Sequence, residues 1–160
     1  MKSVLFLCTG NSARSILAEA YLNHAGRGRF TAHSAGSQPG GRVNPFALEL
    51  LRQRGVPTTG ARSKSWDEFA RPGAPRIDVV VTVCDSAAAE VCPVWPGHPV
   101  TTHWGVPDPA AVAGTDDEKR RAFNDAFAAL SQRIDRLLAL PIDKLEPPEL
   151  KKKLDEIGRR

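Results

Sequence analysis

The stretch SVLFLCTGNSARS, residues 3–15, decides which fold the rest of the chain must complete. Its first half is a short apolar run typical of a buried strand. The pattern of ARSILAEAYLNHAG, residues 13–26, then predicts a helix that ends at Gly26. A cysteine, several small residues and an arginine stand between the two elements. A strand that runs through a tight turn into a helix favours an anion-binding site at the turn.

The remaining sequence alternates between strand and helix patterns. Strands are expected at 29–36, 77–84 and 98–104, helices at 44–55 and 115–140, and one or two helical turns at 65–70. Asn44 and Pro45 suit a helix start, and Thr115 with Glu118 forms a capping-box pattern. We therefore predict an α/β fold, with a single parallel β-sheet of about four strands and helices on both faces.

Length and composition favour one folded unit. The chain has 160 residues, of which 41% are hydrophobic and 25% charged, enough for one core. We expect a catalytic domain over residues 1–140 and a C-terminal extension, residues 141–160, that could form a short helix. The apolar part of MKSVLFLC is too short for a signal peptide, and no run approaches the roughly 18 apolar residues of a membrane span. A cytoplasmic protein without a membrane partner is expected.

The charge pattern argues against nucleic-acid binding. The net charge is only +4, and the extension 141–160 carries six basic residues against five acidic ones, a balance of +1. A nucleic-acid surface would show unbalanced basic residues interleaved with aromatic ones. The mild positive surplus is better suited to attracting a small oxyanion.

Three cysteines, Cys8, Cys84 and Cys92, are too few and odd in number for a secreted disulfide framework. The four histidines lack the spacing of zinc ligands. The cysteines are therefore candidates for catalysis or redox chemistry.

Residues 8–15 have the chemistry of an oxyanion cradle. A free cysteine has a pKa of about 8.5, and a helix N-terminus with a nearby arginine lowers it. We predict that Cys8 is a thiolate near neutral pH, that Arg14 grips the anion with its guanidinium, and that Ser15 donates a hydrogen bond to the sulfur. The backbone amides that would line the cradle belong to Thr9, Gly10, Asn11, Ser12 and Ala13.

The motif VLFLCTGNSARS, together with VPDPA at 106–110, resembles the low-molecular-weight protein tyrosine phosphatase superfamily. Within it the chain is most similar to arsenate reductases of the thioredoxin-coupled type, over roughly residues 3–140. The resemblance implies that Cys8 attacks the oxyanion, Arg14 holds its oxygens and Asp108 is the general acid. The prolines on either side of Asp108 fit this role because they stiffen its loop.

The resemblance also implies a thiol relay. Cys84 would attack the arsenylated Cys8 to release arsenite, and Cys92 would resolve the disulfide that forms. No tightly bound cofactor is implied, but an external thiol reductant is: thioredoxin, glutaredoxin with glutathione, or another low-molecular-weight thiol. The chain departs from the family in the spacing of Cys84 and Cys92, which is one residue longer, and in having Ala13 where relatives often carry a further cysteine.

The predicted elements bring Cys8 close to Cys84 but keep Cys84 apart from Cys92. Cys8 and Cys84 end strands that could be neighbours, about 4.8 Å apart, which is within reach of a disulfide. If residues 85–91 are helical, Cys92 lies about 12 Å from Cys84 along the helix axis. We therefore expect this segment to unwind when the cysteines are oxidised.

Two other functions remain open. A phosphatase acting on phosphate monoesters is the first alternative, but tyrosine phosphatases of this superfamily usually have Asp-Pro-Tyr where this chain has Asp108-Pro109-Ala110, and Tyr21 is the only tyrosine. A non-enzymatic oxyanion-binding module would not need Asp108. Some reductases of this type also bind potassium.

The potassium site is matched only in part. Asn11, Glu19 and Ser34 fit it, whereas Ser65 stands where a carboxylate is expected.

Overall fold

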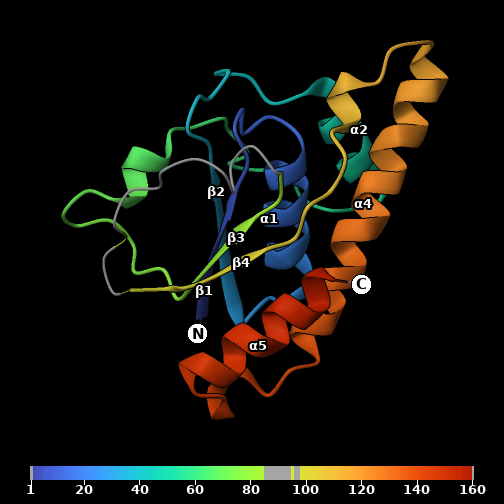
Figure 1. Ribbon diagram of the computed structural model, residues 1–160. Helices are drawn as coiled ribbons and strands as arrows, with labels where there is room; N and C mark the ends of the chain where they lie inside the picture. Colours follow the sequence, from blue (N-terminus) through green and yellow to red (C-terminus); the bar gives the residue numbers. More distant parts are fainter. Residues whose placement is uncertain (1, 85–94, 96–97, 160) are drawn as a thin grey trace.

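The computed structural model describes residues 2–84, 95 and 98–159. These residues contain a four-stranded sheet in the order β2-β1-β3-β4, and every pairing is parallel (Figure 1). The strands are β1 (Lys2–Leu7), β2 (Phe30–Ala35), β3 (Val79–Thr82) and β4 (Val100–His103). The predicted parallel α/β sheet is thus confirmed. Leu7 pairs with both Ala35 and Thr82, so three strands end together at one edge.

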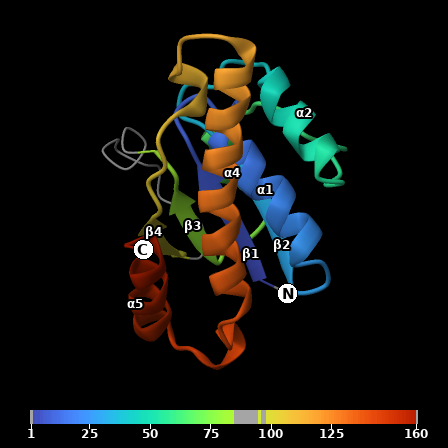
Figure 2. The same ribbon diagram turned by 90° about the vertical axis from the view of Figure 1, so that its right-hand side faces the viewer.

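Both faces of the sheet are covered. Helices α1 (Arg14–Ala25), α2 (Pro45–Gln53) and α4 (Asp116–Leu138) pack on one face, with α4 in front and α1 and α2 beside it in Figure 2. Side chains on that face, such as Val4 and Phe6, join the main core. Leu5 and Leu7 point to the opposite face, where they pack with Phe69 of the short 3₁₀ helix η1 (Trp66–Phe69).

Local sequence signals explain where two helices begin. The Asn44 side chain accepts a hydrogen bond from the Phe46 N–H (2.9 Å), and Pro45 opens α2. Thr115 Oγ1 accepts from the Glu118 N–H (3.2 Å) while Glu118 Oε1 accepts from the Thr115 N–H (3.4 Å), so the predicted capping box is present. Helix α1 differs because no side chain caps its first turn within the described residues. Its N-terminal end directly follows residues 8–13, which we call the cysteine loop.

The C-terminal residues form η3 (Ile142–Lys144) and the helix α5 (Pro147–Gly158), which packs against β4. Trp104 Nε1 donates to the Leu154 carbonyl (3.0 Å), and Thr102 Oγ1 donates to Asp155 (2.7 Å). Buried side chains of α5 belong to the same core as those of α4. The extension therefore covers the sheet edge that β4 would otherwise leave open.

No helix in the described ranges is both long and apolar enough to cross a membrane.

Helix α5 approaches the end of β4 closely at Gly158. A Cβ atom there would lie 2.5 Å from the His103 carbonyl oxygen and 2.7 Å from Trp104 Cδ1. Gly158→Ala should lower the free energy of unfolding by about 1–3 kcal/mol, although alanine normally favours a helix. Urea denaturation followed by circular dichroism measures this change.

Gly40→Ala is the matched control, because a Cβ at residue 40 meets nothing within 4 Å. It should leave stability within about 1 kcal/mol of the unmodified protein. Equal stability of the two variants would contradict the close packing of α5 on β4.

Candidate active site

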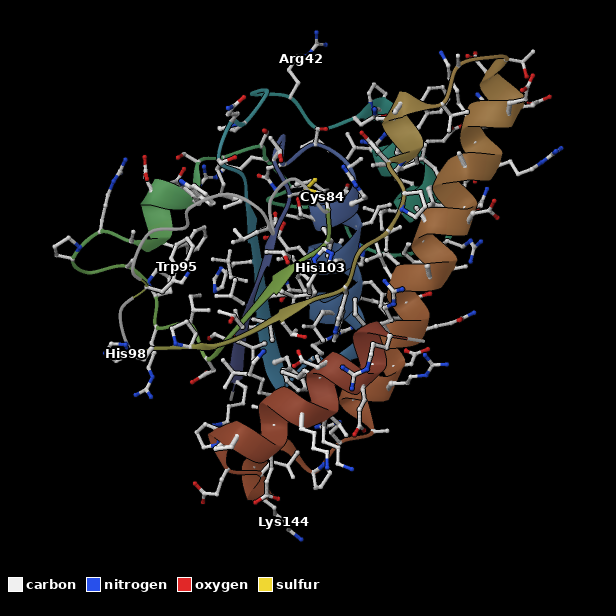
Figure 3. The ribbon with its side chains drawn as sticks, in the orientation of Figure 1. Arg42, Cys84, Trp95, His98, His103 and Lys144 are labelled. Atoms are coloured by element: carbon white, nitrogen blue, oxygen red, sulfur yellow. The ribbon has the colours of Figure 1, made fainter. Side chains whose placement is uncertain are left out.

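Two cysteines meet at the edge where the parallel strands end. Cys8 directly follows β1, and Cys84 lies two residues beyond the neighbouring strand β3. Figure 3 shows Cys84 at this edge, close to the start of α1. Both thiols are buried, with exposed fractions of 5% and 3%, and neither forms a disulfide within the described residues. The predicted placement of the two cysteines on neighbouring strand ends is confirmed.

The two thiols are neighbours. Cys84 acts on the Cys8 thiol as a hydrogen-bond partner that raises its pKa, and the Thr9 N–H donates to Cys84 Sγ over 3.4 Å. Thr9 Oγ1 lies 3.6 Å from the same sulfur. Cys84 is therefore part of the cysteine loop's own hydrogen-bond network.

This contact reverses the expected ionisation of Cys8. The hydrogen bond to Cys84 and burial both raise the pKa of Cys8 above its ordinary value. The Arg14 charge and a hydrogen bond from the Gly10 N–H act in the opposite direction but are weaker. The direction of this shift opposes the expectation that Cys8 is a thiolate near neutral pH. Sequence patterns had placed Cys84 within reach of Cys8, but they had not shown that its thiol and burial would oppose the ionisation of Cys8.

The loop after Cys8 directs its carbonyl oxygens outward. Three of them accept N–H groups from the following segment: Thr9 from Gln38 (3.0 Å), Gly10 from Gly40 (3.1 Å) and Ser12 from Asn44 (2.9 Å). The Gly10 N–H hydrogen-bonds to the Cys8 sulfur, whereas the Thr9 N–H donates to Cys84 Sγ. The amide-lined cradle over the whole loop stays a prediction.

Asn11 occupies the centre of the loop and is fully buried. Its φ of 46° lies in the left-handed region, which asparagine tolerates better than most residues. Asn11 Oδ1 accepts from the Lys64 N–H (2.8 Å), and Asn11 Nδ2 donates to Ser15 Oγ (2.8 Å). Asn11 is thus a structural link, and the predicted bond from Ser15 to the Cys8 sulfur stays a prediction.

Gly36 contributes to the site and was missed by sequence reasoning. A Cβ atom at this position would lie 2.6 Å from the Cys8 carbonyl oxygen and even closer to that of Thr9. Only glycine lets the end of β2 approach the loop so closely. The glycine that directly follows the predicted strand, in SAG, was the available signal.

Arg14 has a buried donor left over. Its side chain is only 12% exposed, and Nη1 donates to the Val106 carbonyl (2.9 Å). Arg14 Nε is buried without a hydrogen-bond partner in the described part of the chain. A buried N–H that lacks an acceptor is costly, and an anion in the cradle would supply one.

Asp108 lies at the other side of this arginine. Its Oδ2 is 3.6 Å from Arg14 Nη2, and its Oδ1 accepts from the Ala110 N–H (2.9 Å) at the start of η2 (Pro109–Ala111). The carboxyl is 41% exposed, so it can exchange protons with water. The structure therefore brings together Cys8, Arg14, Asp108 and Cys84, as the sequence pattern predicted.

Two other predictions have different outcomes. Cys92, and the helix expected at 85–91, lie outside the described residues. The partial potassium site holds a lysine: Lys64 Nζ donates to the Ser34 carbonyl oxygen (2.8 Å), and Ser34 Oγ donates to Glu19 (2.9 Å). A protein cation therefore lies where the sequence suggested a potassium ion. No cluster of three or more histidine, cysteine or acidic side chains suited to a metal occurs in the described ranges.

Comparison with known proteins identifies the family. The model of the low molecular weight phosphotyrosine protein phosphatase family matches residues 3–155, nearly the whole chain. The chain belongs to this family. The cysteine loop, the arginine and the aspartate described above all lie within the matched range.

Relatives within the family are named arsenate reductases. The protein from Bacillus licheniformis is 36% identical over 135 residues, which cover 84% of this chain and 94% of that one. The protein from Halalkalibacterium halodurans is 37% identical over 133 residues, covering 83% and 92%.

Two solved structures extend the comparison. The thioredoxin-dependent arsenate reductase of Corynebacterium glutamicum matches with a TM-score of 0.62 and 26% identity, over 86% of this chain and 60% of that one. The low molecular weight protein tyrosine phosphatase from T. tengcongensis matches with a TM-score of 0.70 and 26% identity, over 91% and 100%. Proteins named as arsenate reductases and proteins named as tyrosine phosphatases thus share this fold, so the fold does not distinguish the two activities.

Replacing Cys84 should lower the pKa of Cys8 relative to the unmodified protein. Cys84→Ala removes the hydrogen bond that raises the pKa most, and leaves Arg14 and the Gly10 N–H in place. Each unit by which the pKa falls makes the thiolate about tenfold more abundant below it. Iodoacetamide labelling of Cys8 at pH 7, followed by peptide mass mapping, should be at least about tenfold faster in the variant.

Cys84→Ser is the matched control, because a hydroxyl can keep a hydrogen bond to Cys8. It should accelerate labelling less than the alanine variant does. Labelling profiles that are identical in Cys84→Ala and the unmodified protein would contradict the role of this contact.

Proposed function

We propose that the chain is an arsenate reductase that uses Cys8, Cys84 and Cys92 in sequence. The observation that carries this proposal is the buried contact between the Cys8 and Cys84 thiols. Reduction of arsenate to arsenite takes two electrons, which two adjacent thiols supply by forming a disulfide. Ester hydrolysis needs one nucleophile and has no use for the second thiol.

The first step forms a bond between Cys8 Sγ and arsenic. Arg14 and the loop amides hold the oxyanion, and Arg14 Nε gains the acceptor that it lacks within the described protein residues. One As–O bond breaks, and its oxygen leaves as water after taking the Cys8 thiol proton and a proton from Asp108. The oxyanion is itself a base beside Cys8, so a raised pKa of the thiol does not block this step.

The second step is the reduction. Cys84 Sγ attacks Cys8 Sγ, the S–As electron pair stays on arsenic, and arsenic(V) becomes arsenic(III). Arsenite leaves with the Cys84 proton, and the two sulfurs are oxidised to a disulfide. Cys92 then attacks Cys84, which frees Cys8, and an external dithiol reduces the Cys84–Cys92 bond.

The external reductant completes the cycle, and we propose thioredoxin for this role, with glutaredoxin or a low-molecular-weight thiol as alternatives. The naming of a relative as thioredoxin-dependent supports the first choice. A thiol relay of this kind works in a reducing compartment, so we also propose a cytoplasmic location.

Phosphate-ester hydrolysis is the second candidate, because the same loop and acid would serve it. Two features favour small esters over phosphotyrosine. Ala110 follows the Asp-Pro pair, and the only tyrosine, Tyr21, donates to Asp135 (2.6 Å) between α1 and α4. Ala110 therefore supplies no ring at the position where tyrosine phosphatases of this superfamily usually have a tyrosine. A binding module without turnover would leave Asp108 and the thiol pair without a purpose.

The deciding experiment measures arsenite production by the purified protein with thioredoxin, thioredoxin reductase and NADPH. Cys84→Ser should abolish arsenite release but keep hydrolysis of p-nitrophenyl phosphate, because only the reduction needs the second thiol. Cys92→Ser should stop after one turnover with a Cys8–Cys84 disulfide, which peptide mass mapping detects. Steady-state reduction by Cys92→Ser with thioredoxin would exclude the relay. Ester hydrolysis without any arsenite from the unmodified protein would favour the phosphatase.

Asp108 is expected to act on the reaction rate and not on binding. Asp108→Asn keeps the hydrogen bond to the Ala110 N–H but cannot deliver a proton, so formation of the Cys8 adduct should slow by roughly 10²-fold. Rapid-quench kinetics with saturating arsenate measures this step. Phosphate protection of Cys8 from iodoacetamide serves as the binding control and should change little. Weaker protection with an unchanged adduct rate would mean that Asp108 only positions the loop.

A further inference from the structure

Lys64 is a buried lysine whose ammonium group is enclosed by oxygen atoms. The residue is only 7% exposed. Its Nζ donates to the Ser34 carbonyl (2.8 Å), the Arg62 carbonyl (2.9 Å) and the Ser34 hydroxyl (3.3 Å). Three donors thus meet three oxygens, which satisfies the ammonium without water.

A half-buried carboxylate completes this cluster. Ser34 Oγ, which contacts the ammonium, donates to Glu19 Oε1 over 2.9 Å. Burial raises the pKa of Glu19 and lowers that of Lys64, whereas the attraction between the two charges opposes both shifts. Each charge therefore depends on the other, because an isolated buried carboxylate or ammonium is strongly unfavourable.

The backbone of Lys64 is tied to the cysteine loop. Its N–H donates to Asn11 Oδ1 (2.8 Å), and its carbonyl accepts from the Gly36 N–H (2.9 Å). Asn11 is the residue with left-handed φ, and it also holds Ser15. Residue 64 is therefore linked by a backbone hydrogen bond to the centre of the loop at Asn11.

The neighbouring arginine does not supply this charge. The Arg62 guanidinium is exposed and forms two hydrogen bonds with Glu68, of 2.6 and 3.0 Å. It turns away from the buried oxygens that Lys64 contacts, and only its carbonyl takes part in the cluster.

We propose that Lys64 is a positioning residue whose ammonium acts as a built-in monovalent cation that holds Asn11 and keeps the loop in its oxyanion-binding shape. The ammonium draws the Ser34 and Arg62 carbonyls and the Glu19 carboxylate around one charge, and this anchors the backbone N–H that Asn11 accepts. Oxyanion binding by this chain then needs no dissolved cation. The inference rests on the oxyanion site proposed above, but it concerns binding and not the reduction.

The first test uses the unmodified protein. Phosphate binding is measured as protection of Cys8 from iodoacetamide, in potassium chloride and in choline chloride at equal ionic strength. The phosphate dissociation constant should be the same within twofold, because the cation position is already filled. A severalfold tighter constant in potassium would overturn the proposal. This readout does not involve arsenate, so its result is independent of whether arsenate is the substrate.

The second test removes the ammonium. Lys64→Ala should weaken phosphate binding at least tenfold in choline chloride, and 100 mM ammonium or potassium chloride should restore most of the loss. Lys64→Met fills the same space without a charge, so it should bind as weakly and resist rescue. Arg62→Gln, which removes an equal charge two residues away, should bind phosphate normally.

Lys64→Gln tests the charge without the loss of side-chain volume in Lys64→Ala. Its side chain is nearly as long as lysine and keeps two N–H donors. Circular dichroism confirms that each variant is folded before its binding is measured. The Gln variant should bind phosphate at least fivefold more weakly than the unmodified protein. Normal binding by a folded Lys64→Gln, or equal responses of the Ala and Met variants to potassium, would show that the charge has no positioning role.

Discussion

The parallel pairing of β1 with strands on both sides is the constraint on which the site depends. Backbone hydrogen bonds place Leu7 level with Ala35 on one side and Thr82 on the other. The residues that follow these strands are therefore delivered to one edge of the sheet. Cys8, Gly36 and Cys84 meet there because their strands end in register. The helix α1 then begins at that edge, so its positive end faces the same small volume.

The site combines groups that oppose one another electrostatically. Burial and thiol contact stabilise the protonated form of Cys8, while Arg14 and the Gly10 N–H favour the thiolate. Arg14 is itself held by the Val106 carbonyl and lies near Asp108, both on the loop that follows β4. An arriving anion would meet a pre-arranged arginine with one buried donor unused.

A second layer of residues maintains the loop. N–H groups of the segment 38–44 donate to carbonyl oxygens of the loop and so hold its shape. The Lys64 N–H donates to the Asn11 side chain. None of these contacts reaches the reacting sulfur. They matter because a cradle of backbone amides binds an anion only when the amides are already aligned, and alignment costs conformational freedom that the surrounding contacts must offset.

The sequence by itself determined the elements and the location of the candidate nucleophile, because these depend on local patterns. Alternating apolar runs, the Asn44–Pro45 start and the Thr115 capping box are read within a few residues, and Cys8 with Arg14 lies inside one short turn. The predicted strand neighbours also placed Cys84 beside Cys8. Only the tertiary structure showed that Gly36 and the Lys64 ammonium, which come from distant segments, support that turn. The direction of the Cys8 pKa shift depends on that environment, since burial and a neighbouring thiol outweigh the local helix and arginine.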